Sequence, residues 1–170
     1  MVTDHRLSSL LTRDHLEVLR MGAAYRTVVV GTDGSESSFA AVDRAAAVAG
    51  DAGATLVIAC AYYPASKSDV DKAQDVLGDE AYQVVGSAPA EDTLQSARDR
   101  ATRAGAEKID TVAVKGDPVD SLRKVVHERE ADLLVVGNRG LNTIAGRILG
   151  SVPSEVARKS GVDVLIVHTT

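Results

Sequence analysis

The run YRTVVVG, residues 25–31, decides how the rest of the chain is interpreted. It is short, rich in β-branched valine and closed by a glycine, which is typical of a strand buried on both faces of a sheet. Four similar runs follow at intervals along the chain. They are ATLVIACAY (54–62), IDTVAVK (109–115), ADLLVVG (131–137) and VDVLIVH (162–168).

Helical segments are predicted between these runs, and their order indicates the fold. The predicted helices begin near Glu36, run from about Pro89 to Ala104, follow Asp117, and extend from Ser151 to about Lys159. Strands alternating with helices predict an α/β fold, a doubly wound five-stranded parallel sheet with helices on both faces. Right-handed crossovers favour the strand order 3-2-1-4-5. Strands 1 and 4 are then neighbours, and a ligand crevice opens beyond their carboxyl ends.

Composition narrows the classes of function. The chain has 170 residues, which suits one domain, and its net charge of -5 disfavours binding to nucleic acid or acidic lipid. Aromatic residues make up 3%, too few to build a stacking platform for bases. No apolar run approaches the roughly 18 residues of a membrane span. The single cysteine, Cys60, lies in an apolar run and is expected to be buried. A cytoplasmic location fits these features.

Residues 1–24 differ from the remainder of the chain. They are polar, and Leu7, Leu10, Leu11 and Val18 could line one face of a helix. We expect a flexible or weakly helical N-terminal extension over 1–24 and one domain over 25–170. A helix that docks on a partner is the alternative for the extension.

The glycine-rich stretch GNRGLNTIAGRILGS, residues 137–151, follows the fourth strand. Its spacing is set by Gly137, Gly140, Gly150 and Ser151. Glycines let backbone N–H groups approach phosphate oxygens, and the start of the next helix favours an anion. Arg139 and Arg147 add positive charge to a stretch without acidic residues. The stretch therefore predicts a phosphate site, although glycines and a helix cap with only structural roles are the alternative.

Neither of two common nucleotide motifs accounts for these loops. The Walker A motif requires a lysine that RILGSV lacks, and the dinucleotide motif G-x-G-x-x-G would follow the first strand. GTDGS (31–35) follows the first strand instead. Its Asp33 could accept hydrogen bonds from a ribose, hold a metal through a nucleotide, or only cap the next helix.

GTDGSESS after the first strand, GDP at 116–118 and the spacing G-x2-G-x9-G-S together resemble the universal stress protein family over about residues 25–170. In that family the spacing marks members that bind ATP. The resemblance implies that Gly31, Thr32 and Asp33 face the adenosine, that Ala61 contributes backbone atoms to the adenine pocket, that Gly137, Asn138, Arg139 and Gly140 wrap the ribose and phosphates, and that Gly150, Ser151 and Val152 bind phosphate.

A narrower resemblance concerns the ligand. GLNTIAGRILGSVP and VDVLIVHTT are similar to a single-domain branch whose members bind cyclic AMP. Cyclic AMP or ATP is therefore the expected ligand, and Mg²⁺ is possible alongside ATP. Between Gly140 and Gly150 the only charge is Arg147, which suits a cyclic monophosphate better than a triphosphate.

Catalytic groups are scattered, so we expect a binding protein that senses or sequesters its nucleotide. The histidines are His5, His15, His127 and His168, and no metal-ligand spacing lies near the glycine loops. A slow ATP hydrolase and a dimeric interaction protein without nucleotide binding are the alternatives. The apolar run 162–168 would form a sheet edge, which predicts a homodimer through that strand.

Overall fold

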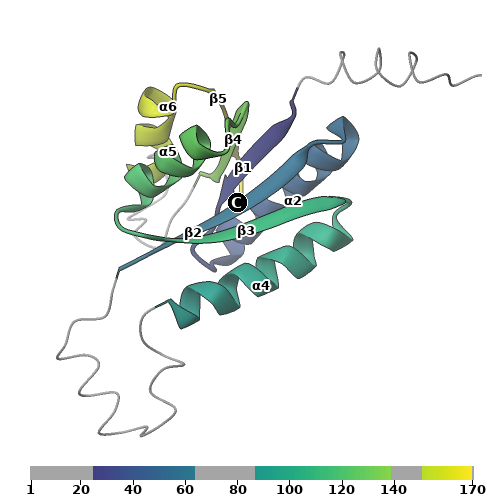
Figure 1. Cartoon of the computed structure of the whole chain (residues 1–170), viewed down its shortest axis with the longest axis horizontal. Coiled ribbons are helices and arrows are strands. Elements are labelled where there is room, and N and C mark those ends of the chain that lie inside the picture. Colours follow the sequence, from purple (N-terminus) through teal and green to yellow (C-terminus); the bar gives the residue numbers. More distant parts are fainter. Residues whose placement is uncertain (1–24, 64–86, 139–150, 170) are drawn as a thin grey trace, which may run out of the picture.

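Figure 1 shows the computed structural model of the chain. The described residues are 25–63, 87–138 and 151–169. The predicted extension, residues 1–24, lies outside them.

Five strands and four helices alternate along the described residues. They are β1 (Thr27–Gly31), α2 (Glu36–Ala52), β2 (Thr55–Tyr62), α4 (Ala88–Arg103), β3 (Lys108–Lys115), α5 (Pro118–Glu128), β4 (Leu133–Gly137), α6 (Ser151–Lys159) and β5 (Asp163–Val167). All strand pairs are parallel, and their order is β3-β2-β1-β4-β5. The predicted fold class and strand order are confirmed.

Two apolar layers enclose the sheet, with α2 and α4 on one face and α5 and α6 on the other (Figure 1). Successive side chains of a strand point to opposite faces. Val28 and Val30 accordingly pack in the layer under α2 and α4, whereas Val29 packs in the layer under α5 and α6. All three are fully buried, which explains why β1 is a run of valines rather than an alternating pattern.

Asp132 joins β4 to β1, the neighbouring strands from which the chain continues to opposite sides of the sheet. Its Oδ2 accepts hydrogen bonds from the backbone N–H groups of Arg26 at 2.7 Å and Thr27 at 3.0 Å. The hydrogen bond from the Arg26 backbone holds the pKa of Asp132 below its usual value, against the effect of partial burial. This carboxylate therefore helps to set β4 beside β1 in the register Val28 to Leu133, and the carboxyl ends of both strands lie together, where this topology is expected to form a ligand crevice.

Candidate functional site

The loop between β1 and α2 is held together by its own hydroxyl groups. Thr32 is only 6% exposed, and its Oγ1 lies 2.9 Å from the Ser38 hydroxyl oxygen. The backbone N–H of Thr32 donates to the Ala59 carbonyl at 2.9 Å, and Gly34 N–H donates to Thr32 Oγ1 at 3.2 Å. The side chain and N–H of Thr32 are thus both used within the fold, and they shape the loop.

Asp33 presents an ionised carboxylate at the carboxyl end of β1. The residue is exposed, and its Oδ1 accepts hydrogen bonds from the Ser35 hydroxyl at 2.6 Å and the Ser35 N–H at 3.0 Å. Partial desolvation acts to raise the pKa of Asp33, but the bonds donated by Ser35 outweigh it and hold the pKa below its ordinary value. The carboxylate is therefore charged at neutral pH and its orientation is set before any ligand arrives.

The N-cap of α2 is Ser35 and not Asp33. The Ser35 hydroxyl oxygen accepts the backbone N–H of Ser38 at 3.2 Å. The interpretation of Asp33 as only a helix cap is therefore wrong, because its carboxylate accepts hydrogen bonds from Ser35 and not from backbone N–H groups of the first turn of α2. No pattern in the sequence indicated that Ser35 both caps α2 and orients Asp33.

Gly31 ends β1 where α5 packs closely. A Cβ at this position would lie 3.0 Å from both terminal methyl groups of Leu122. The residue is thus a glycine because the buried Leu122 occupies the space that a side chain would need.

Ala61 lies beside the turn formed by the GDP motif. It is a half-buried residue near the end of β2, in register with Val114. Gly116, with φ +136, donates its N–H to the Tyr62 carbonyl at 2.9 Å. Asp117 then caps α5 by accepting the N–H of Val119 at 2.9 Å. GDP therefore ends β3 and starts α5 next to the predicted adenine pocket.

The remaining predicted residues lie at the end of β4 and the start of α6. Gly137 is buried and in register with Val167, and the N–H of Asn138 donates to the Val167 carbonyl at 2.9 Å. Ser151 is exposed at the first position of α6, and Val152 packs on the apolar layer below. Arg139, Gly140, Arg147 and Gly150 lie outside the described residues.

Cys60 is a buried residue of β2. Burial first, and then the negative charge of Asp33, raise the pKa of its thiol to about 11. The thiol is therefore protonated at neutral pH, and the prediction of a core cysteine is confirmed.

Over residues 25–63, 87–138 and 151–169, no group of three or more histidine, cysteine and acidic side chains could hold a metal ion. Within the same ranges, no helix has the length and apolar character needed to cross a membrane. His127 is exposed on α5, and His168 is exposed after β5, with its Nδ1 3.3 Å from Asn138 Nδ2.

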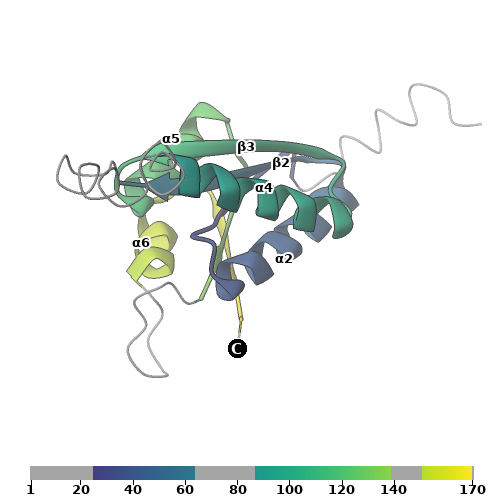
Figure 2. The same ribbon diagram turned by 90° about the horizontal axis from the view of Figure 1, so that it is seen from below.

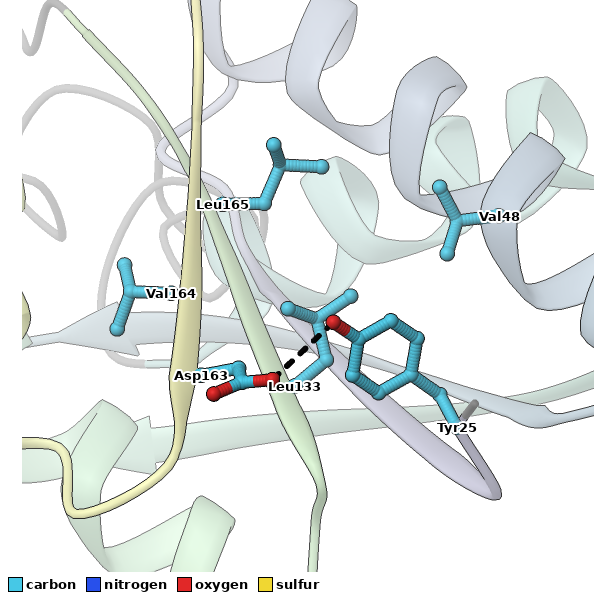
Figure 3. Close-up of a pocket in the computed structure, with 6 residues that line it drawn as sticks. All are labelled: Tyr25, Val48, Leu133, Asp163, Val164 and Leu165. Atoms are coloured by element: carbon cyan, nitrogen blue, oxygen red, sulfur yellow. Dashed lines mark hydrogen bonds between the residues drawn. The ribbon is translucent and has the colours of Figure 1, made fainter. Parts of the chain in front are cut away.

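A separate groove of about 300 Å³ opens at the opposite end of the sheet (Figure 3). It is lined by Tyr25, Val48, Leu133, Asp163, Val164 and Leu165. The Tyr25 hydroxyl donates to Asp163 Oδ2 at 3.2 Å. Because Leu133 and Asp163 begin their strands, this groove lies at the amino ends and is distinct from the crevice at the carboxyl ends.

The crevice combines groups suited to a ligand with both hydroxyls and an anionic group. The start of α2 and the end of β5 lie at the same end of the sheet, where the strands have their carboxyl ends (Figure 2). Asp33 offers a charged acceptor after β1, β4 ends at Gly137, and α6 begins at Ser151. A carboxylate can accept from sugar hydroxyls, and a helix start favours a phosphate.

Comparisons with a family profile and with known proteins both find universal stress proteins. A family profile described as the universal stress protein family matches residues 24–168. The universal stress protein Rv1636 of Mycobacterium tuberculosis is 56% identical over 148 residues, which cover 87% of this chain and 99% of that protein.

Solved structures extend the comparison. The crystal structure of a universal stress protein in complex with cAMP shares 51% sequence identity, with a TM-score of 0.67, over 86% of this chain and 98% of the other. A universal stress protein from Archaeoglobus fulgidus in complex with dAMP is 20% identical, with a TM-score of 0.60 over 84% of this chain and 98% of the other, and supports the fold alone.

Proposed function

The chain belongs to the universal stress protein family, and we propose that it binds an adenine nucleotide in the crevice between β1 and β4. The observation that carries the proposal is the 51% identity to a universal stress protein crystallised with cAMP, over 98% of that chain. An ionised Asp33 at the same crevice supports it, because a ribose needs an acceptor for its hydroxyls.

Each predicted residue has a role in this proposal. Asp33 accepts from the ribose hydroxyls, and the backbone near Gly31, Thr32 and Ala61 borders the adenosine. The backbone of Gly137 and Asn138 and the hydroxyl of Ser151 face the ribose and phosphate, together with Val152. Arg139, Gly140, Arg147 and Gly150 complete the phosphate site by the sequence motif alone. The protein senses or sequesters the nucleotide, and neither a metal nor a catalytic step is required.

Cyclic AMP is expected to bind at least as tightly as ATP. The carboxylate of Asp33 repels the several charges of a triphosphate more than the single charge of a cyclic monophosphate. Calorimetric titrations with both nucleotides, followed by competition between them, measure the difference. Displacement of bound cyclic AMP by ATP at tenfold lower concentration, equal to about 1.4 kcal/mol, would contradict the preference.

We further propose a homodimer through β5. Its residues Val164, Leu165, Ile166 and Val167 are only half-buried at one edge of the sheet, whereas the other edge strand, β3, carries exposed Lys108, Asp110 and Lys115. Charged side chains protect an edge from pairing, and an apolar edge invites it.

Ile166→Lys is expected to convert the dimer to a monomer in sedimentation experiments, because a desolvated ammonium would face the partner strand. Thr111→Lys on β3 serves as the matched control and should leave the mass unchanged. A monomeric wild-type chain would rule out the dimer.

A further inference from the structure

We propose that Thr169 and Asn138 are positioning residues that tie together the two sides of the nucleotide crevice. Thr169 follows β5, Asn138 follows β4, and the third member of the link is Ser37 in the first turn of α2. The inference rests on the proposed nucleotide binding and adds to it the hydrogen bonds that join these three side chains.

The side chain of Asn138 takes the place of a backbone group in the sheet. The backbone N–H of Asn138 donates to the Val167 carbonyl at 2.9 Å, as in a parallel ladder. The next bond of such a ladder would run from Thr169 N–H to the backbone carbonyl of residue 138. Here Thr169 N–H donates instead to Asn138 Oδ1 at 3.0 Å. Residue 169 is therefore attached to the end of β4 through a side chain and not through a backbone carbonyl.

The Thr169 hydroxyl extends this contact to α2. Its Oγ1 donates to Asn138 Oδ1 at 2.6 Å and lies 2.6 Å from the Ser37 hydroxyl oxygen. A hydroxyl has one proton, and the Thr169 proton is already directed at Asn138, so the Ser37 hydroxyl must be the donor to Thr169. The bonds form a directed chain from Ser37 through Thr169 to Asn138. It links the helix that follows the Asp33 loop to the residue that follows Gly137.

This arrangement changes the role of Asn138. Its Oδ1 already accepts two hydrogen bonds from Thr169, and its Nδ2 lies 3.3 Å from His168 Nδ1. The amide is thus committed to the frame of the crevice, and Asn138 acts on the ligand through the placement of its backbone. A crevice held at fixed width lowers the entropy that binding must remove, so these bonds raise affinity without touching the nucleotide.

Titration of the full chain with cyclic AMP tests the link. Thr169→Val keeps the shape but removes the hydroxyl, and we expect it to weaken binding by about three- to tenfold, the effect of one or two neutral hydrogen bonds. Thr169→Ser keeps the hydroxyl and should bind within about twofold of the wild type. Ser37→Ala breaks the same chain at its other end and should weaken binding similarly.

The double variant of Asn138→Ala and Thr169→Val separates positioning from independent effects. Because both changes break one chain of bonds, the double variant should bind about as weakly as Asn138→Ala alone. The inference is overturned if the fold loss in affinity of the double variant equals the product of the losses of the two single variants. It is also overturned if Thr169→Ser binds cyclic AMP as weakly as Thr169→Val.

Ser160→Ala is the matched control, because its hydroxyl donates to the Val162 carbonyl at 3.0 Å just before β5. Its affinity for cyclic AMP should equal that of the wild type. If the wild type binds cyclic AMP and both Thr169→Val and Ser37→Ala bind it equally well, this inference fails and the proposed function stands. A wild-type chain that binds neither cyclic AMP nor ATP would overturn the proposed function itself.

Discussion

Asp33→Asn is expected to weaken cyclic AMP binding by about 30- to 100-fold, the equivalent of losing charge-assisted hydrogen bonds worth about 2–3 kcal/mol. The carboxylate is exposed at the crevice, and both the hydroxyl and the N–H of Ser35 hold its Oδ1 in place. An amide of the same shape keeps that frame but loses the charge and one acceptor atom. Calorimetric titration of the two proteins at pH 7 gives the ratio of dissociation constants.

Asp51→Asn makes the same change of charge at the opposite end of α2, where the residue is exposed, and it should leave affinity unaltered. The pH dependence provides a second check. Because the pKa of Asp33 is lowered, its carboxylate persists below the ordinary value near 3.9, and its contribution to binding is lost only as pH falls through the lowered pKa. Affinity that is insensitive to Asp33→Asn would remove this residue from the site.

Gly50→Ala is expected to destabilise the protein by about 1–3 kcal/mol through overpacking, although alanine is the better helix former by about 1 kcal/mol. Gly50 lies near the end of α2, and a Cβ there would overlap the backbone carbonyl of Gly105. Gly105 has φ +103 in the turn after α4, so its carbonyl cannot move without shifting that turn. Urea unfolding followed by circular dichroism measures the loss.

The control for this prediction is Asp51→Ala, an exposed position next to Gly50 in the same helix. Its free energy of unfolding should stay within about 0.5 kcal/mol of the wild type. A Gly50→Ala variant that gains stability would mean that helix propensity outweighs the contact between the two chain segments.

Prediction of the strands from the sequence was accurate in their centres and less so at their ends. The predicted fourth strand, 131–137, begins at Leu133 in the structure, and the predicted first strand, 25–31, begins at Thr27. The reason is Asp132, whose carboxylate accepts the N–H groups of Arg26 and Thr27. A side chain thus bonds to the backbone where both strands begin, and no periodicity of apolar residues can reveal that.

For the candidate site, the sequence located the loops but not the direction of their side chains. The glycine spacing and GTDGS indicated the crevice beside β1 and β4, which is where the topology opens it. The Thr32 side chain points inward to Ser38, and the Asp33 carboxylate points to Ser35. Each hydrogen bond is one of several that the neighbouring polar groups could form. Such choices depend on local geometry and not on residue type.

The layered fold follows from residue type and order alone, because runs such as Val28 to Val30 must be buried on both faces and right-handed crossovers leave few strand orders. Which distant groups meet can be learned only from the folded chain. Thr169 reaches Ser37 across 132 positions of the chain, and Gly50 meets the backbone of Gly105. Burial depends on residue type and period, which are local properties, whereas hydrogen bonds and close packing require the whole fold to place atoms within tenths of an ångström.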